Sequence, residues 1–446
     1  MLQSLLVSHK SLVTEDEDHT VSNDADNGSS ACRTLSSAEK LCEGISNTRP
    51  LSLDVNDDAA LDAEMEKTDL AISLIPYTFH ATVIKSAIRK KKDVVTTSYV
   101  SPAMMELDGE AKEAGITVMN EIGVDPGLDH LWAVKTIHEV HQAGGKITSF
   151  KSFCGGLPAP EASDNPLGYK FSWSSRGVLL ALRNTAKFYQ DNEEVTYSGP
   201  DLMASAKPYF IYPGFAFVAY GNRDSTPYRE RYNIPEAQTL IRGTMRYQGF
   251  PEFIRVLLDI GFLSEDKHDF LNQPIPWAEA TSKILGASGK GDQDLQWAIS
   301  SKTKFANNEE KDRIISGLKW IGVFSDKPIT PRGTPLDTLC ATLEEKCQYE
   351  KGERDMVMLQ HKFGIEWADG KTETRTSTLC DYGDPNGYSS MAKLVGVPCA
   401  VACLAILEGR IKKPGVQAPI TWDLAEPLLV ELQKKYGIEL TEKTID

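Results

Sequence analysis

Short apolar runs alternate with helical patterns at a regular pace between residues 36 and 130. The apolar runs read as strands, and the stretches between them carry apolar residues at helical spacing. Ser101-Pro102 supplies an N-cap and a first-turn proline for one helix, which ends at Gly115. Repeated strand–helix–strand units predict a doubly wound parallel sheet of the Rossmann type, whose strands are residues 51–55, 69–75, 93–99 and 116–122.

The pattern becomes mixed after residue 130. Several long segments alternate like strands, and Ala368-Asp-Gly-Lys371 is a hairpin signal between two of them. Residues 176–189 and nearly all of 250–347 are helical in period instead. An all-round apolar helix at 389–407 must be buried. The chain is therefore α/β, with predicted domains at 31–130 plus 389–446 (dinucleotide-binding), 131–249 plus 348–388 (a mixed α+β sheet for substrate binding and dimerisation) and 250–347 (a helical insertion).

The first 30 residues differ from the rest. They are polar and loop-like, with the acidic run Glu15–Asp18 and the segment Ser22–Ser30. Such low apolar content predicts a divergent, disordered segment over residues 1–30. No strand is predicted before Cys32, so the doubly wound sheet is expected to be incomplete at its N-terminus.

Charge, hydropathy and cysteine content indicate which partners and which cellular compartment suit this chain. The 446 residues carry 48 basic and 63 acidic side chains, a net charge of −15, which argues against nucleic acid or an anionic membrane as a partner. The longest uncharged apolar run, residues 394–407, is short for a membrane span. Eight scattered cysteines without a C-x-x-C pair favour reduced thiols, and no signal peptide is evident. We expect a cytoplasmic protein.

The central stretch is Glu121-Ile-Gly-Val-Asp-Pro-Gly-Leu-Asp-His130, where a predicted strand runs into a turn and a long helix. Ligands of open parallel sheets bind beyond the carboxyl ends of the strands, so Asp125 would face the binding crevice. The alternative is that Asp125 only caps the next helix, with Pro126 at its first position. Spacing alone favours the capping interpretation.

A doubly wound sheet suggests a dinucleotide, but the G-x-G-x-x-G fingerprint is absent from the N-terminal region. Ala31-Cys-Arg-Thr34 does precede the first helix, which Ser36-x-x-Glu39 is expected to cap as a capping box. An arginine at this place suits the 2′-phosphate of NADP, although a lone arginine is often only a solvated side chain. We predict no metal site, because His138 and His141 lack accompanying ligands and are better explained as surface residues.

Seven motifs in this order resemble saccharopine reductase, the NADP-dependent, glutamate-forming saccharopine dehydrogenase of the aminoadipate route to lysine. They are Cys-Arg-Thr (32–34), Leu-Asp-Val-Asn-Asp (53–57), Ser-Leu-Ile-Pro-Tyr-Thr-Phe-His (73–80), Thr-Thr-Ser-Tyr-Val-Ser (96–101), Gly-Val-Asp-Pro-Gly-Leu-Asp-His (123–130), Asn-Pro-Leu-Gly-Tyr-Lys-Phe-Ser-Trp-Ser-Ser-Arg-Gly (165–177) and Arg-Gly-Thr-Met-Arg-Tyr-Gln-Gly-Phe (242–250). The resemblance runs from about Ala31 to the C-terminus. It fails before Ala31, where the family has a strand and a Gly-x-Gly turn.

This resemblance implies an activity and a set of site residues. The family condenses aminoadipate semialdehyde with glutamate and reduces the imine with NADPH to give saccharopine. Substrate contacts would come from Ser98, Tyr99, Asp125, Arg223, Thr244, Met245 and Arg246. The NADP(H) contacts would come from Cys32, Arg33, Thr34, Asp54, Val55, Ile75, Thr97, Ser98, Val124, Asp125, Pro126, Gly127, Leu128, Asp129, His130, Leu131 and Ser174.

Asp125 and Tyr99 are the candidates for catalytic proton transfer or positioning. Without the resemblance, Tyr99 would pass for a core or rim aromatic, and any one arginine for part of a surface ion pair. The family also implies a homodimer whose contact lies in the sheet of the second domain.

Two alternatives stay open at this point. The chain could be a catalytically impaired or mis-started form, because the missing phosphate turn would remove several charge-assisted hydrogen bonds. It could also be the related saccharopine-oxidising enzyme of lysine degradation, although Arg33 favours NADP over NAD.

Overall fold

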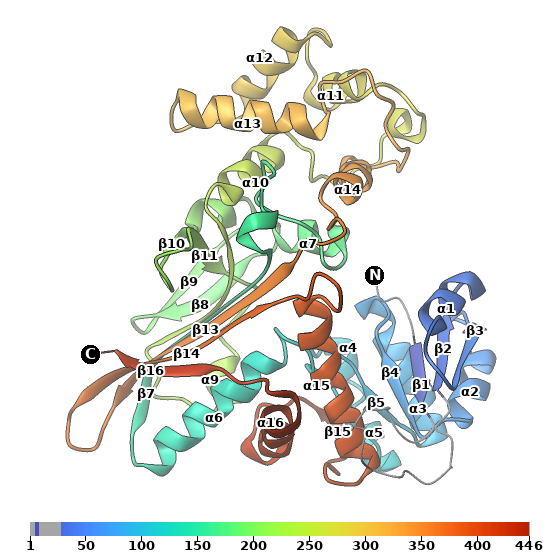
Figure 1. The fold of residues 1–446 in the computed structure, drawn as a ribbon, viewed down its shortest axis with the longest axis vertical. Helices are drawn as coiled ribbons and strands as arrows, with labels where there is room; N and C mark the ends of the chain where they lie inside the picture. The colour runs from blue at the N-terminus through green and yellow to red at the C-terminus, as the bar shows by residue number, and fades with distance from the viewer. Residues whose placement is uncertain (1–4, 9–27, 446) are drawn as a thin grey trace. The chain divides into compact units, whose positions relative to one another are not determined.

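The computed structural model describes residues 5–8 and 28–445. These residues form two compact units (Figure 1). The first comprises residues 1–145 and 392–440, and the second comprises 146–391 and 441–446. The chain thus passes between the units three times.

A seven-stranded sheet forms the centre of the first unit, in the order β15-β6-β5-β4-β1-β2-β3. All neighbouring pairs are parallel except those of β1, which is antiparallel to both β2 and β4. This arrangement confirms the predicted doubly wound sheet. The strands are β1 Leu5–Ser8, β2 Gly28–Cys32, β3 Thr48–Ser52, β4 Leu70–Ser73, β5 Asp93–Val95, β6 Thr117–Met119 and β15 Gly415–Gln417.

The strand β1 corrects the prediction of a wholly disordered N-terminal segment. Its backbone pairs Leu5 with both Ala31 and Ser73, so it occupies the place between β2 and β4. Two facing strands with unpaired backbone groups are a template for a further strand, which explains why a short run is recruited there. The strand β2 also begins within the predicted disordered segment, at Gly28. The rest of that prediction, for residues 1–4 and 9–27, lies outside the described residues.

Helices of the first unit follow local signals in the sequence. Ser101 accepts a hydrogen bond from the Met104 N–H at the start of α4, and Gly115 ends α5 in the left-handed conformation. The predicted capping box at Ser36 is wrong, because the N-cap of α1 is Thr34, two residues earlier, and makes no side-chain capping hydrogen bond. The helices are α1 Leu35–Cys42, α2 Asp58–Glu66, η1 Tyr77–Phe79, α3 His80–Lys90, α4 Pro102–Met105, α5 Asp108–Ala114, α6 Leu128–Gln142, α15 Ser390–Leu407 and α16 Trp422–Tyr436.

The helix α15 begins in the second unit, where Asp355 accepts hydrogen bonds from the Ser390 and Met391 N–H groups at 2.6 and 2.8 Å. Among the described residues it is the one helix long and apolar enough to cross a membrane by composition alone. Half of the apolar window is nevertheless buried inside the protein, as in the core helix of a globular domain. Leu394 and Val401 are fully buried, as predicted for this helix.

A nine-stranded mixed sheet forms the second unit, with the path β10-β11-β12-β7-β13-β14-β16 and the hairpin β8–β9 attached to β12. Its β12–β7 pair is parallel, and β13 and β14 form the predicted hairpin. The predicted helix over 176–189 is wrong beyond Ala181, because β8 begins at Ala186 and pairs with β9 and β12. The strands are β7 Lys146–Pro158, β8 Ala186–Gln190, β9 Glu193–Tyr197, β10 Lys207–Tyr209, β11 Phe217–Gly221, β12 Thr239–Tyr247, β13 Asp355–Glu366, β14 Thr372–Tyr382 and β16 Thr441–Ile445.

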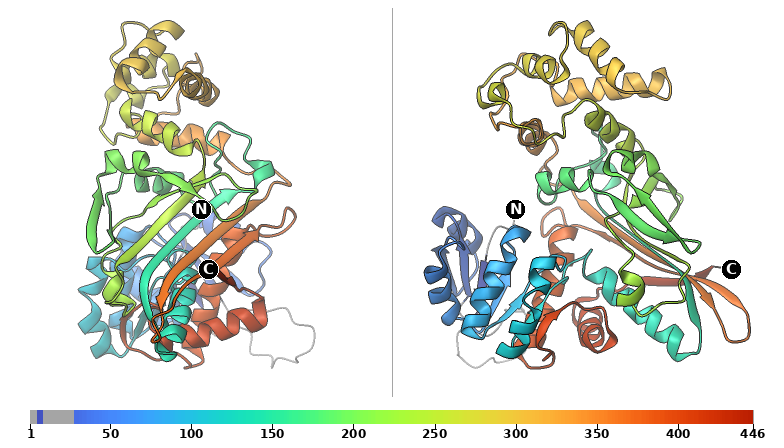
Figure 2. Two further views of the ribbon diagram at one scale, coloured as in Figure 1. Left: turned by 90° about the vertical axis from the view of Figure 1, so that its left-hand side faces the viewer. Right: turned by 180° about the vertical axis from the view of Figure 1, so that it is seen from behind.

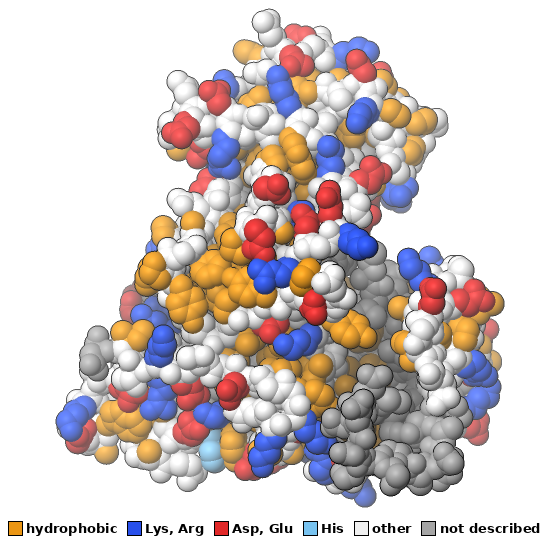
Figure 3. Space-filling model, viewed as in Figure 1, with side chains coloured by type: hydrophobic (Ala, Val, Ile, Leu, Met, Phe, Trp, Pro, Cys, Tyr) orange, Lys and Arg blue, Asp and Glu red, His pale blue; other side chains and the backbone are white. Residues whose placement is uncertain are grey.

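The helical segment of the second unit, α10 to α14, lies within residues 250–347, and α11 to α13 project beyond one end of the sheet (Figures 1 and 2). Its interior is apolar: Phe253, Leu257 and Leu318 are fully buried. Acidic and basic side chains are interspersed over its surface (Figure 3). The helices of this unit are η2 Pro160–Ala162, α7 Ser175–Ala181, α8 Gly199–Leu202, η3 Met203–Ser205, α9 Tyr228–Arg231, α10 Phe250–Asp259, η4 Asp269–Asn272, α11 Trp277–Leu285, α12 Asp292–Lys302, α13 Asn308–Ile321 and α14 Pro335–Lys346.

The two units do not coincide with the three predicted domains, because residues 250–347 lie within the second unit and the boundaries near residues 130, 389 and 441 differ. The predicted boundary after residue 130 falls inside α6, which belongs to the first unit because it packs on α16. His138 stacks on Trp422 there, with the ring centroids 4.5 Å apart. The last six residues belong to the second unit, because β16 pairs with β14.

Candidate active site

The carboxyl ends of β4, β5 and β6 lie side by side in the first unit. The segments that follow these strands carry most of the predicted ligand-contact residues, among them Ile75, Thr97, Ser98, Tyr99 and Asp125. These five residues are partly exposed, whereas the strands behind them are almost entirely buried. The position agrees with the rule that ligands bind at this edge of a parallel sheet.

Tyr99 and Asp125 form the central contact of this edge. The Tyr99 hydroxyl donates a hydrogen bond to Asp125 Oδ1 at 2.7 Å. In the ten residues from Glu121 to His130, Asp125 is the one that is not buried. A carboxylate that is held by a neighbouring hydroxyl and open to ligand is suited to proton transfer or to binding an amino group.

The helix-cap interpretation of Asp125 is wrong. The helix α6 starts at Leu128 with Gly127 as its N-cap, and Asp129 Oδ1 accepts from the Gly127 N–H at 2.7 Å. Gly127 has φ +151°, and a Cβ there would lie 2.0 Å from the Gly123 carbonyl oxygen. Only glycine fits this turn, and its tight backbone displaces Asp125 from the capping position.

A buried pair stabilises the turn from behind. Glu121 Oε1 accepts from the Val100 N–H at 3.0 Å, and Glu121 Oε2 lies 2.7 Å from His130 Nε2. Both side chains are fully buried, and Glu121 has φ +60°. The pair connects the residue after Tyr99 to the first turn of α6, and therefore fixes the two segments that carry Tyr99 and Asp125.

Several predicted cofactor-contact residues of this turn have buried side chains, namely Val124, Leu128, Asp129, His130 and Leu131. A ligand beside the turn could meet these residues only through their backbone atoms. That these residues bind NADP(H) through their backbone atoms stays a prediction.

His80 connects the ends of β4 and β5. Its ring lies 2.7 Å from Ser73 Oγ through Nδ1 and 2.8 Å from Ser98 Oγ through Nε2. Burial lowers the pKa of His80 to about 4, so the imidazole is neutral at physiological pH. No local sequence pattern indicates this role, because the two partners lie 7 and 18 residues away.

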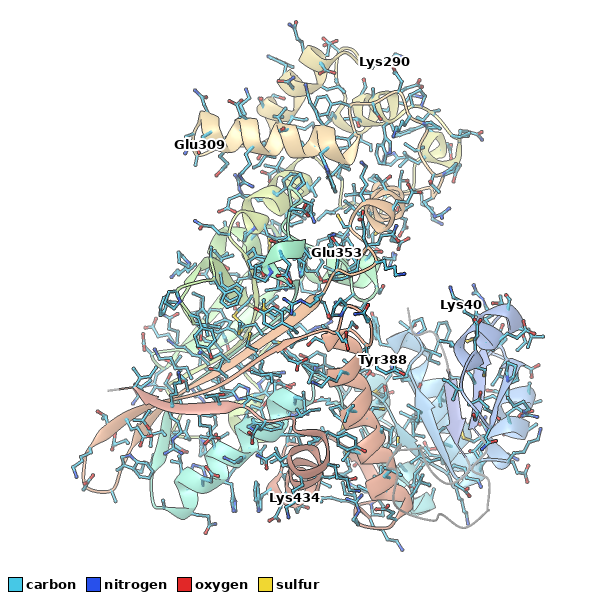
Figure 4. All side chains as sticks on the ribbon, viewed as in Figure 1. Lys40, Lys290, Glu309, Glu353, Tyr388 and Lys434 are labelled. Carbon is cyan, nitrogen blue, oxygen red and sulfur yellow. The ribbon has the colours of Figure 1, made fainter. Side chains whose placement is uncertain are left out.

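The predicted adenine end lies where β2 meets α1. Cys32 is buried, and burial raises the pKa of its thiol, whereas Arg33 and Thr34 are exposed. Hydrogen bonds from the backbone and side chain of Asn56 lower the pKa of Asp54, and the nearby Arg33 guanidinium lowers it further. Lys40, labelled in Figure 4, marks the same helix α1 further from this corner.

The predicted substrate residues of the second unit lie on and beside β12. Arg246 is 8% exposed; its guanidinium carbon lies 4.9 Å from the Tyr169 ring centroid, and its Nη1 donates to the Met245 carbonyl oxygen at 2.7 Å. Thr244 is partly exposed, on the same face of the strand as Arg246, whereas the Met245 side chain is fully buried. Arg223 is exposed and has φ +54°.

Two further contacts concern the 165–177 motif. Lys170 is bound by both carboxylate oxygens of Glu353, labelled in Figure 4, at 2.5 and 2.6 Å. Ser174 is the N-cap of α7 and accepts from the Gly177 N–H at 3.1 Å. The Ser174 hydroxyl therefore already has a structural contact, and its predicted contact with the cofactor remains a prediction.

Comparison with known proteins agrees with this geometry. Residues 19–119 match the saccharopine dehydrogenase NADP binding domain, and residues 123–438 match the saccharopine dehydrogenase C-terminal domain. The chain belongs to the saccharopine dehydrogenase family. This confirms the resemblance drawn from the seven motifs.

Relatives within this family cover nearly the whole chain. A saccharopine dehydrogenase [NADP(+), L-glutamate-forming] of Pyricularia oryzae is 69% identical over 418 residues, 93% of each chain. The protein of the same name from Saccharomyces cerevisiae is 60% identical over 428 residues, 96% of each chain. A solved structure of the apo, histidine-tagged enzyme from S. cerevisiae superimposes with a TM-score of 0.86 at 61% identity, covering 94% of each chain.

The described residues fit NADP(H) at two places expected for a family member. Arg33 is exposed beside the N-terminus of α1, where a phosphate would also meet unpaired backbone N–H groups. Ser98, Tyr99 and Asp125 offer polar groups at the carboxyl edge, where the nicotinamide of such folds lies. The pyrophosphate turn of the fingerprint is absent from residues 28–34, which the structure describes.

One further residue that carried no predicted role is Arg242 on β12. It shares a strand face with Thr244 and Arg246, is 6% exposed, and lies over the Tyr228 ring at 4.2 Å. Its place in the 242–250 motif was visible in the sequence, but the aromatic partner was not.

Proposed function

We propose that this chain is a saccharopine dehydrogenase (NADP+, L-glutamate-forming) of lysine biosynthesis. The observation that carries the proposal is the 69% identity, over 93% of both chains, to a relative of that name. The exposed Arg33 at the β2–α1 corner supports NADP as the cofactor, since a guanidinium binds phosphate well. The names of the relatives from P. oryzae and S. cerevisiae favour this activity over the saccharopine-oxidising alternative of lysine degradation.

The cofactor residues would act in three groups. Arg33 and Thr34 would hold the 2′-phosphate, with Cys32, Asp54, Val55 and Ile75 along the adenosine. Thr97, Ser98 and the 124–131 turn would border the nicotinamide. When bound, NADPH would supply the hydride that reduces the imine carbon of the condensed substrates.

Substrate binding would use charge complementarity. Arginines bind carboxylates bidentately, and Arg223 and Arg246 are the residues proposed to meet those of saccharopine, with Thr244 and the Met245 backbone beside them. Asp125, held by Tyr99, would take up or return the proton of the substrate nitrogen as the imine forms and is reduced. Ser98 would donate to a ligand oxygen.

A steady-state assay of the purified chain with saccharopine and NADP+ tests the proposal. We expect glutamate and aminoadipate semialdehyde to form together with NADPH, and turnover with NAD+ to be much slower. Arg223→Ala should reduce kcat/KM for saccharopine by roughly tenfold or more, because a charge-assisted contact is removed, while the melting temperature changes little. If the purified chain is folded and binds NADPH but forms no glutamate in this assay, the proposal is contradicted.

We also propose that the enzyme is a cytoplasmic homodimer whose contact lies in the sheet of the second unit. The edge strand β16 is exposed along its whole length, and an exposed edge can pair with another chain. All eight cysteines are free, which suits a reducing compartment. Light scattering of the purified chain would separate a dimer from a monomer.

A further inference from the structure

His80 lies at a crossing of three elements of the first unit. It is the first residue of α3, and its ring lies between the end of β4 and the end of β5. Ser73 and His80 are each 1% exposed, whereas Ser98 is partly exposed. A chain of hydrogen bonds therefore runs from a buried serine through a buried imidazole to a hydroxyl at the candidate active site.

A neutral imidazole has one N–H donor and one acceptor nitrogen. His80 is neutral because burial disfavours its charged form, and its position at the N-terminus of α3 adds to this effect. One of the two serines must therefore donate to the ring, and the other must accept from it.

The Ser73 hydroxyl decides which serine donates. Among the described residues it has one hydrogen-bond partner, His80 Nδ1 at 2.7 Å. A buried hydroxyl that only accepted there would leave its proton unpaired, and unpaired buried donors are rarer than unused lone pairs. Ser73 therefore donates to Nδ1, and the ring proton is on Nε2.

The Nε2–H then points to Ser98 Oγ at 2.8 Å, with Thr96 Oγ1 further away at 3.4 Å. The Ser98 oxygen accepts this bond, so the Ser98 proton is not needed inside the protein. It remains available to a ligand at the carboxyl edge of the sheet.

We propose that His80 is a positioning residue that, as the Nε2–H tautomer, orients the Ser98 hydroxyl to donate to a carbonyl or carboxylate oxygen of the bound ligand. The inference rests on the proposed function for the identity of that oxygen. It could belong to a carboxylate of saccharopine or to the carboxamide of the nicotinamide, and both are sp² oxygen acceptors. His80 itself touches neither.

Two amide substitutions separate positioning from simple packing. In His80→Gln the amide nitrogen can reach the place of Nε2 and keep the donor to Ser98. In His80→Asn the shorter side chain reaches only the place of Nδ1, so it keeps the contact with Ser73 and loses Ser98. Both variants remove a buried imidazole, so their melting temperatures are expected to fall by similar amounts.

We expect His80→Asn to lose roughly tenfold in kcat/KM for saccharopine, the value of about one hydrogen bond, and His80→Gln to stay within about threefold of the unsubstituted chain. A rise confined to KM for saccharopine would assign the oxygen to the substrate, and a rise in the NADPH Kd would assign it to the nicotinamide. In a Ser98→Ala background, His80→Asn should have no further effect on either constant. Equal activities of the two variants, or an additive loss in the Ser98→Ala background, would overturn the proposal.

The tautomer of His80 can also be measured by NMR, without an assay of activity. In the ligand-free chain with ¹⁵N-labelled histidine, the ring signals missing from the His80→Gln spectrum identify His80. We expect a protonated Nε2 and an unprotonated Nδ1, and the opposite tautomer would overturn the proposal. Lack of turnover by the unsubstituted chain would count against the proposed function instead. The NMR measurement would still test the tautomer of His80.

Discussion

Two corners of the first unit are built very differently. At the ends of β4, β5 and β6, nearly every polar side chain has a partner in the fold: Tyr99 with Asp125, Glu121 with Val100 and His130, and Ser98 with His80. At the end of β2, Arg33 and Thr34 are exposed and no ion pair holds the Arg33 guanidinium among the described residues. The polar groups of the first corner are preorganised for chemistry. At the second corner, the Arg33 guanidinium becomes ordered only when a ligand binds.

The difference has an energetic meaning. Preorganised groups pay little ordering entropy when a ligand binds, so substitutions there should affect the rate and the stability of the fold. An exposed arginine contributes little to folding and acts mainly through the ligand it meets. Four predictions test this contrast, in order of decreasing effect.

The largest effect is expected for Asp125→Ala. Loss of a proton-transfer group costs about 10²- to 10⁴-fold in kcat, and the fold should persist because Asp125 is partly exposed and caps no helix. Stopped-flow or steady-state rates with saccharopine and NADP+ measure this. Tyr99→Phe, which removes the 2.7 Å hydrogen bond to Asp125 and keeps the carboxylate, serves as the milder comparison. Normal rates in Asp125→Ala would remove Asp125 from the mechanism.

Glu121→Gln should chiefly reduce stability. Its fully buried carboxylate accepts from the Val100 N–H and lies 2.7 Å from His130 Nε2, and each lost contact of a buried charged group costs about 1.5–3 kcal/mol of the free energy of unfolding. Urea denaturation would report the loss. Glu139→Gln on α6, the helix that carries His130, weakens a more exposed pair with Lys135 and should cost less than about 1 kcal/mol. Similar losses for both variants would show that the buried pair does not hold this corner together.

The neutral His80 makes stability depend on pH. Its pKa is about 4 in the folded chain against 6.5 for an unperturbed histidine, so the unfolded chain binds more protons between these limits. The stability is therefore complete above pH 6.5 and falls by about 3 kcal/mol as the pH approaches 4. Because carboxylates also titrate there, the quantity to measure is the difference between the chain and His80→Asn in urea melts at both pH values. An unchanged difference would mean that His80 is not held neutral.

The smallest effect is expected at the open corner. Arg33→Ala should raise the Kd of NADPH by about 10- to 100-fold, the value of one or two charge-assisted hydrogen bonds, and leave the Kd of NADH and the melting temperature nearly unchanged. Arg49→Ala is the control, because Arg49 lies on the adjacent strand β3 but is paired with Glu64 at 2.7 Å. Equal weakening of NADPH and NADH binding would mean that Arg33 does not bind the 2′-phosphate.

Local signals explain what the sequence could predict. Caps and glycines such as Ser101-Pro102 and Gly115 act within a few residues, so β4, β5 and β6 lie within their predicted ranges. The strand β3, however, begins three residues before the predicted strand 51–55, and β1 and β2 were not predicted. The hairpin at Ala368–Lys371 is equally local. The family resemblance then added the site residues that no periodicity contains.

The errors come from distant partners. The predicted helix over residues 176–189 ends early, because residues 186–190 pair with β9 and β12 and form the strand β8. The strand β1 is short and forms only because β2 and β4 leave a place between them. The Tyr99 hydroxyl that donates to Asp125 is 26 residues away in sequence, so spacing favoured the nearer capping role.

Titration of NADPH against the purified chain, followed by cofactor fluorescence, tests the central claim that the first unit holds an NADP site. The account predicts saturable binding with a Kd in about the micromolar range, clearly weakened in Arg33→Ala and unchanged in Arg49→Ala. A folded chain that does not bind NADPH would contradict it, and would favour the catalytically impaired form that the missing Gly-x-Gly turn suggests.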